Sequence, residues 1–259
     1  MRLLATFALG AAAAAGVRDD ALLVRAQNAS GGAERFGTIR SVEIRAVTDS
    51  TGSKSTGGAI IRAILPDHLF LAEIVPGINE RIRLAEVGVA GTRTKLGDYV
   101  ADFVRGSEGD RRIRDEIGRI LAAHLLYVSS ECKLSRQGSP QAPRLLVDEP
   151  CAPLRFRFDA TQRPARLEYW TRRLQAPNES KSVVLSSNYN VNTITLSDFR
   201  TVQNVTLPFK AVTERQSTSF AFQVSVIRLN PVLKPRELDI SSDLSEARKW
   251  LTSAVRLKR

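Results

Sequence analysis

The stretch from Asn190 to Asp239 most constrains the fold, because it reads as three consecutive β-strands. Val, Thr, Ile and Phe fill the runs 191–203, 204–215 and 220–230, and turn-forming residues separate these runs. In the last run the pattern places on one face Phe220, Phe222, Val224 and Val226, and on the other face Ala221, Gln223, Ser225 and Ile227. This period of two predicts an antiparallel sheet with one well-buried face, and Pro231 ends the run because proline cannot donate to the ladder.

The same stretch carries a family resemblance. Residues 198–208 read Asp-Phe-Arg-x-Val-x-x-Val-x-Leu-Pro, and residues 224–231 read Val-x-Val-Ile-x-Leu-Asn-Pro. In this order they resemble the C-terminal half of LolA-like proteins, the bacterial periplasmic carriers of outer-membrane lipoproteins. Asn204 stands where that pattern usually has glycine, and asparagine also tolerates the left-handed backbone of such a turn. The resemblance holds no catalytic signature, so it speaks to fold more than to function.

A long central helix is predicted from Arg111 to Val128, with Asp110 as its N-cap. From Ile120 onward this helix is apolar on nearly every side, which requires protein around it. A concave sheet would supply that protein, so we expect the helix inside the curve. His124 lies on the apolar face, where it is either a hydrogen-bonded core residue or a functional residue.

These patterns predict an α+β fold: a strongly curved antiparallel half-barrel of about ten strands, with helices packed on its concave side. The same fold is implied by the LolA-like resemblance. Further strands are predicted at Leu154–Phe158, Ala165–Thr171 and Ser182–Ser187, whereas Ser129–Pro153 is interpreted as irregular. Residues 242–259 predict a basic amphipathic helix that either packs on the body or lies on a membrane.

The N-terminus is typical of a signal peptide. After Arg2, an uncharged run of apolar and small residues extends from Leu3 to Val17 and is too short to span a bilayer. We therefore expect a signal peptide at residues 1–16, cleavage on export to the periplasm, and a single domain at residues 17–259.

The chain has two cysteines, Cys132 and Cys151, which flank the proline-rich stretch. In an exported protein two such cysteines most simply form one disulfide. A reactive thiol or a metal pair is the alternative, although other metal ligands are lacking.

Positive charge is the unusual feature of the composition, since Lys and Arg number 38, Asp and Glu number 27, and the net charge is +11. Such a charge favours solubility, an anionic membrane surface or nucleic acid as explanations. The basic residues are spread along the chain without a nucleic-acid motif, so we expect no nucleic-acid partner. Signatures of nucleophilic, zinc, dinucleotide and kinase chemistry are also lacking, and we expect no catalytic residue, metal or cofactor.

The resemblance implies a non-enzymatic carrier or binder of a lipid or of an acylated protein, and we expect a monomer. A curved sheet leaves an apolar space beside its helices, and each buried CH₂ of an acyl chain contributes about 0.8 kcal/mol. The side chains predicted to line this cavity are Leu125, Phe156, Phe158, Phe209, Phe220 and Phe222. Ordinary core packing is the other interpretation of these residues. The alternative function is an envelope sensor or protein-interaction module on the same fold, without lipid cargo.

Overall fold

The computed structural model describes residues 21–50, 56–75, 79–86, 89–96, 99–105, 107–139, 141–148, 151, 153–172, 189–215, 218–239 and 243–256. The predicted signal peptide and the predicted strand Ser182–Ser187 lie outside these residues. Within the described part of the chain, no helix has both the length and the apolar character needed to cross a bilayer.

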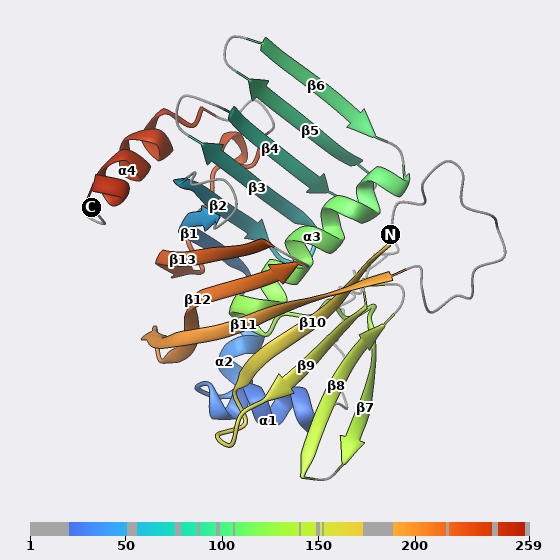
Figure 1. The fold of residues 1–259 in the computed structure, drawn as a ribbon. Helices are drawn as coiled ribbons and strands as arrows, with labels where there is room; N and C mark the ends of the chain where they lie inside the picture. Colours follow the sequence, from blue (N-terminus) through green and yellow to red (C-terminus); the bar gives the residue numbers. More distant parts are fainter. Residues whose placement is uncertain are drawn as a thin grey trace, which may run out of the picture.

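The described strands form one open antiparallel sheet of thirteen strands, in the order β6-β5-β4-β3-β2-β1-β13-β12-β11-β10-β9-β8-β7 (Figure 1). The chain therefore starts near the middle, runs out to one edge, crosses to the other edge and returns to pair β13 with β1. The strands are β1 (Ser41–Ser50), β2 (Thr56–Ile64), β3 (His68–Val75), β4 (Asn79–Glu86), β5 (Val89–Leu96), β6 (Tyr99–Arg105), β7 (Lys133–Ser139), β8 (Ala142–Asp148), β9 (Leu154–Phe158), β10 (Pro164–Arg172), β11 (Tyr189–Val202), β12 (Val205–Arg215) and β13 (Thr218–Leu229).

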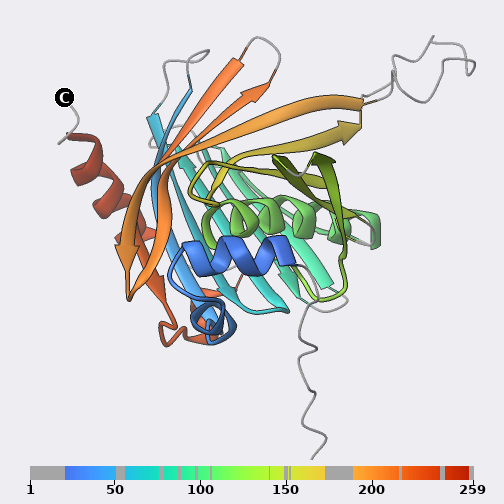
Figure 2. The ribbon, with the colours of Figure 1, turned by 90° about the horizontal axis from the view of Figure 1, so that it is seen from below.

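Helices lie on both faces of the curved sheet (Figure 2). On the concave side are α1 (Ala21–Ala29) and α3 (Ser107–Leu125), and α2 (Ala33–Gly37) follows α1. On the convex side is α4 (Ser245–Arg256), preceded by the 3-10 helix η2 (Pro235–Glu237). The predicted fold class is confirmed, and the sheet is wider than the expected ten or so strands.

Two apolar cores follow from this arrangement, one on each face of the sheet. Along β2, Ala59, Ile61 and Ala63 join the concave core with α3, whereas Ile60 joins a convex core with α4. Leu251 of α4 packs directly over Gly58, where an added Cβ would lie 2.7 Å from the leucine Cδ1. The C-terminal helix therefore packs on the body, the first of the two predicted alternatives.

A buried carboxylate on the convex face ties β1 to its neighbours. Glu43 is 3% exposed and accepts from Arg62 Nε at 2.8 Å, Arg45 Nε at 3.0 Å and Arg228 Nη1 at 3.2 Å. Burial raises the pKa of Glu43, but the hydrogen bond from Arg62 and the charge of Arg45 lower it by more. The pKa of Glu43 is therefore below its ordinary value. Arg62 also donates to the Glu237 carbonyl at 3.0 Å, which fixes η2 on the sheet.

The predicted assignment of β13 side chains to the two faces of the sheet is wrong beyond Val224, because the strand contains a β-bulge. Arg45 of β1 pairs with Val226, but Ala46 pairs with Val224, so Ser225 is an extra residue on β13. The extra residue reverses the alternation. Phe222 and Val224 therefore share the core with Ile227 and Leu229, and Val226 does not join them.

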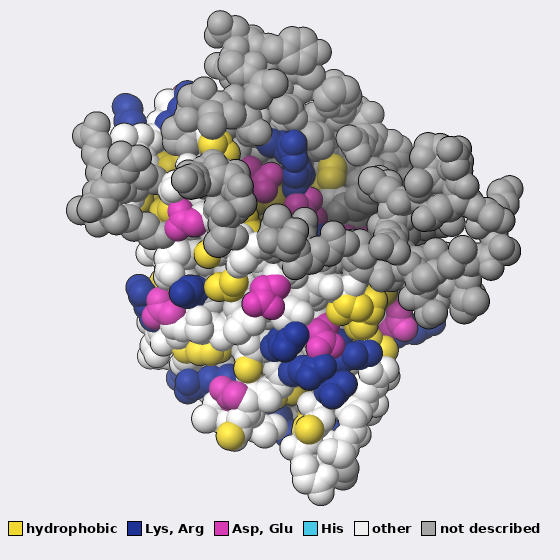
Figure 3. Space-filling view, viewed as in Figure 1, with side chains coloured by type: hydrophobic (Ala, Val, Ile, Leu, Met, Phe, Trp, Pro, Cys, Tyr) yellow, Lys and Arg dark blue, Asp and Glu magenta, His cyan; other side chains and the backbone are white. Residues whose placement is uncertain are grey.

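The interpretation of Ser129–Pro153 as irregular is wrong, because this stretch contains the hairpin of β7 and β8. Its alternation is masked in the sequence by prolines and charged residues. In β8 only Leu145 and Val147 are buried, so only two positions of this strand form its apolar face. Strands β9 and β10 alternate clearly, since Phe156 and Leu167 are buried and the neighbouring arginines point outward. Figure 3 shows Lys and Arg side chains around an acidic side chain over these two strands.

His124 fixes α3 against β12. Its Nδ1 lies 2.9 Å from the Pro208 carbonyl oxygen and therefore donates to it, and its ring packs against Phe222 at 5.3 Å between centroids. The side chain is 2% exposed. Burial lowers the pKa of His124 to about 4, although the hydrogen bond to Pro208 acts in the opposite direction. This environment is that of a hydrogen-bonded core histidine.

We predict that acid destabilises the protein through His124. The unfolded histidine titrates near 6.5, so between pH 6.5 and about 4 the unfolded state binds a proton that the folded state does not. The free energy of unfolding should be level above that window and fall by about 2 kcal/mol by pH 5. Urea unfolding of the wild type and of His124→Gln from pH 7.5 to 5 checks this, and equal slopes for the two proteins would contradict it.

Candidate functional site

The side of α3 that faces away from β12 borders a cavity. The helix ends at Leu125, and Leu126 takes a positive φ of 49°, so the chain leaves the helix axis and leads to Cys132. The predicted helix extended to Val128. Instead, Tyr127 and Val128 belong to a non-helical segment, and both line the cavity together with Val147 of β8 and Leu154 of β9.

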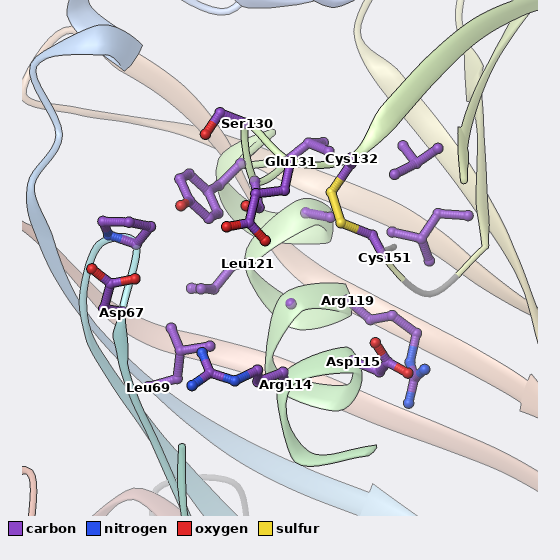
Figure 4. A pocket seen from close by; sticks show the side chains of 18 residues that line it. Asp67, Leu69, Arg114, Asp115, Arg119, Leu121, Ser130, Glu131, Cys132 and Cys151 are labelled. Carbon is purple, nitrogen blue, oxygen red and sulfur yellow. A yellow bond between two sulfur atoms is a disulfide. The ribbon is translucent and has the colours of Figure 1, made fainter. Parts of the chain in front are cut away.

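The cavity has a volume of about 400 Å³ and lies between α3, the β2–β3 turn and the disulfide (Figure 4). The apolar side chains of its wall are largely buried: Leu69, Leu121, Ala122, Val128, Val147 and Leu154. Tyr127 and Pro66 complete this apolar lining. The wall thus combines residues from four separated parts of the sequence.

Charged side chains surround the opening. They are Asp67, Arg114, Asp115, Arg119 and Glu131. Figure 4 shows Glu131 directed toward Leu121, and Arg114 directed toward the side of Leu69. The Arg119 guanidinium lies over the Tyr169 ring, 4.9 Å from its centroid. Among the described residues of the lining, two arginines against three carboxylates give a formal charge of 2 − 3 = −1.

No family model matches the chain, and no curated protein sequence matches it. Among solved structures, a LolA superfamily protein from Nitrosomonas europaea superposes with a TM-score of 0.54 at 9% identity, covering 84% of this chain and 96% of that one. A putative outer membrane lipoprotein-sorting protein domain from Vibrio parahaemolyticus superposes with a TM-score of 0.50 at 10% identity, covering 84% and 95%. The chain has a LolA-like fold. At these identities the likeness concerns the fold alone.

The residues predicted to line a cavity occupy other places in this LolA-like fold. Leu125, Phe156, Phe209 and Phe222 are buried in the concave core, and Phe158 packs against that core with its ring stacked on Phe156 at 6.2 Å. Phe220 is 38% exposed near the start of β13. These side chains are not among those that line the cavity beside α3. Their role as ligand contacts stays a prediction.

The wall residues that sequence reasoning missed come from separate elements. Leu69, Val147 and Leu154 lie in three different strands, β3, β8 and β9, and nothing in a linear pattern shows that they meet. The one signal in the sequence for this wall was the segment after Ile120, which is apolar on nearly every side. It contains Leu121, Ala122, Tyr127 and Val128. In the described part of the chain, no group of three or more His, Cys, Asp or Glu residues is arranged to hold a metal ion.

Cys132 and Cys151 form a disulfide with 5.3 Å between their Cα atoms, and both line the cavity. The bond spans the β7–β8 hairpin, which reaches the rest of the sheet through β9. It therefore holds the end of the segment after α3 against the start of β9.

We predict that reduction of this disulfide lowers the free energy of unfolding by about 3 kcal/mol, because the open chain regains the entropy of a 19-residue loop. Urea unfolding with and without a thiol reductant measures the change. The double variant Cys132→Ser/Cys151→Ser should show the lowered stability and no response to reductant. An unchanged urea midpoint in fully reduced wild-type protein would argue against a stabilising bond.

Proposed function

We propose that this chain is an exported periplasmic carrier or binder of a lipid or of a lipid-modified protein, and that it holds an acyl chain in the cavity beside α3. The observation that carries this proposal is the buried apolar wall of a cavity that opens between charged residues. An acyl chain fits such a wall because it needs no directional partner, and its polar end can stay among the charges at the mouth.

The volume of the cavity favours one chain. A methylene group is similar in size to a water molecule, which occupies roughly 30 Å³ in the liquid. A cavity of about 400 Å³ therefore holds on the order of a dozen methylenes. Ligands with two or three long chains need more space, and the concave core around Leu125 and Phe156 is the adjacent apolar region into which the cavity could extend.

The fold comparisons support this assignment, since one of the superposed structures is described as a lipoprotein-sorting domain. The apolar N-terminal run supports export. The two features together favour a binder that works outside the cytoplasm, and neither implies catalysis.

We predict that Ala122→Phe weakens binding of a fluorescent fatty acid at least about tenfold. The phenyl ring fills space in the cavity, and displacing even two methylenes removes about 1.6 kcal/mol. Ala21→Phe, at an exposed position on α1, is the matched control and should bind like the wild type. Equilibrium fluorescence titration measures both, and thermal unfolding checks that both variants fold.

Mass spectrometry of the purified mature protein tests the same proposal without a chosen probe. We expect co-purified molecules that carry an acyl chain. Repeated purification of empty protein that also fails to bind the fluorescent fatty acid would overturn the proposal. A stable protein partner recovered from an envelope extract, with no lipid bound, would favour the sensor or interaction module instead.

A further inference from the structure

The outer face of the β8–β10 strands carries a row of arginines on neighbouring strands. Arg144 of β8 is paired with Arg157 of β9, and Arg157 is paired with Arg166 of β10. The row continues to Gln137 on β7 and to Thr195 on β11, so none of its five positions holds a carboxylate. Because Phe156 and Leu167 alternate with these arginines and are buried in the concave core, the arginines lie on the convex side.

This row is unfavourable for the isolated fold. Like charges directly opposite each other on adjacent strands destabilise a sheet. Glu168, which is 5% exposed, relieves part of the repulsion by pairing with Arg155 at 3.2 Å and with Arg157. Four arginines against this one glutamate leave a formal charge of 4 − 1 = +3, and Arg166 is otherwise held by a hydrogen bond to Thr193 Oγ1 at 3.0 Å.

Apolar side chains lie on the same face of β10 and β11, four residues along the strands from Arg166 and Thr195. The Arg155 guanidinium lies 5.0 Å from the Trp170 ring centroid, and Trp170 is paired with Val191, which is 57% exposed. Tryptophan and arginine are favoured where a surface is apolar on one side and wet on the other. Figure 3 shows hydrophobic side chains close to the basic cluster on this face.

We propose that this face, defined by Arg144, Arg155, Arg157, Arg166 and Trp170, docks on an anionic phospholipid surface. Phosphate groups relieve the repulsion within the row, and each basic residue near such a surface strengthens attachment. Trp170 and Val191 meet the interfacial region between headgroups and acyl chains, where tryptophan is favoured. The proposal is independent of the cavity, whose mouth carries a different charge and lies beside α3.

Arg144→Gln/Arg166→Gln tests the proposal and leaves both ion pairs of Glu168 intact. Co-sedimentation is measured with vesicles of phosphatidylcholine mixed with phosphatidylglycerol, and with vesicles of phosphatidylcholine alone. We expect the wild type to bind only the anionic vesicles at low salt, and the double variant to bind them about thirtyfold more weakly. The control Arg25→Gln/Lys249→Gln makes the same change in net charge at exposed positions on α1 and α4, and should weaken binding less than about threefold.

Two further readouts separate docking from a structural role. Thermal unfolding should show the Arg144→Gln/Arg166→Gln protein at least as stable as the wild type, because repulsion has been removed. In a Trp250→Phe background, anionic vesicles should shift the emission of Trp170 to shorter wavelength. Equal losses for the two double variants, no shift of Trp170 emission in bound protein, or binding to duplex DNA without binding to vesicles would each overturn the proposal.

Discussion

The path of the chain from β6 to β7 is the constraint on which the rest of the structure depends. These two strands are the opposite edges of the sheet, and α3 is the element that connects them. A single helix can join both edges only if the sheet curves around it, so the curvature and the central position of α3 are one requirement. The Glu116–Arg83 ion pair to β4 and the His124–Pro208 hydrogen bond to β12 attach the helix to both halves of the sheet. The cavity lies beside this helix, between it, the β2–β3 turn and the disulfide.

Local alternation and turn chemistry were enough to predict much of this fold from the sequence. The turn between β11 and β12 is an example, since Gln203 and Asn204 adopt positive φ angles of 48° and 65°, as expected where the family pattern has glycine. The facing of β13 beyond Val224 could not be predicted, because a bulge depends on the partner strand and leaves no mark in a period of two. The β7–β8 hairpin was missed because only two of its strand residues, Leu145 and Val147, are buried. The cavity wall was predictable only near Leu121 and Tyr127, since its other members meet through long-range topology.

The cluster of arginines and the apolar cavity lie on different parts of this molecule. Among the described residues, the cavity lining has one more carboxylate than arginines, while four arginines lie with one glutamate on the convex face of β8–β10. The net charge of the sequence therefore says little about the charge of the cavity lining. The convex core under α4 adds a second asymmetry. It covers the outer face of β1 to β4, whereas no helix of the described residues covers the outer surface of β8–β10.

The disulfide links the oxidation state of the chain to the shape of the cavity. Its sulfur atoms belong to residues that stabilise the fold and also form part of the cavity wall. The wall of the cavity around Cys132 and Cys151 is therefore complete only in the oxidised chain. Under the proposed function, oxidation of the two thiols comes before the binding of an acyl chain.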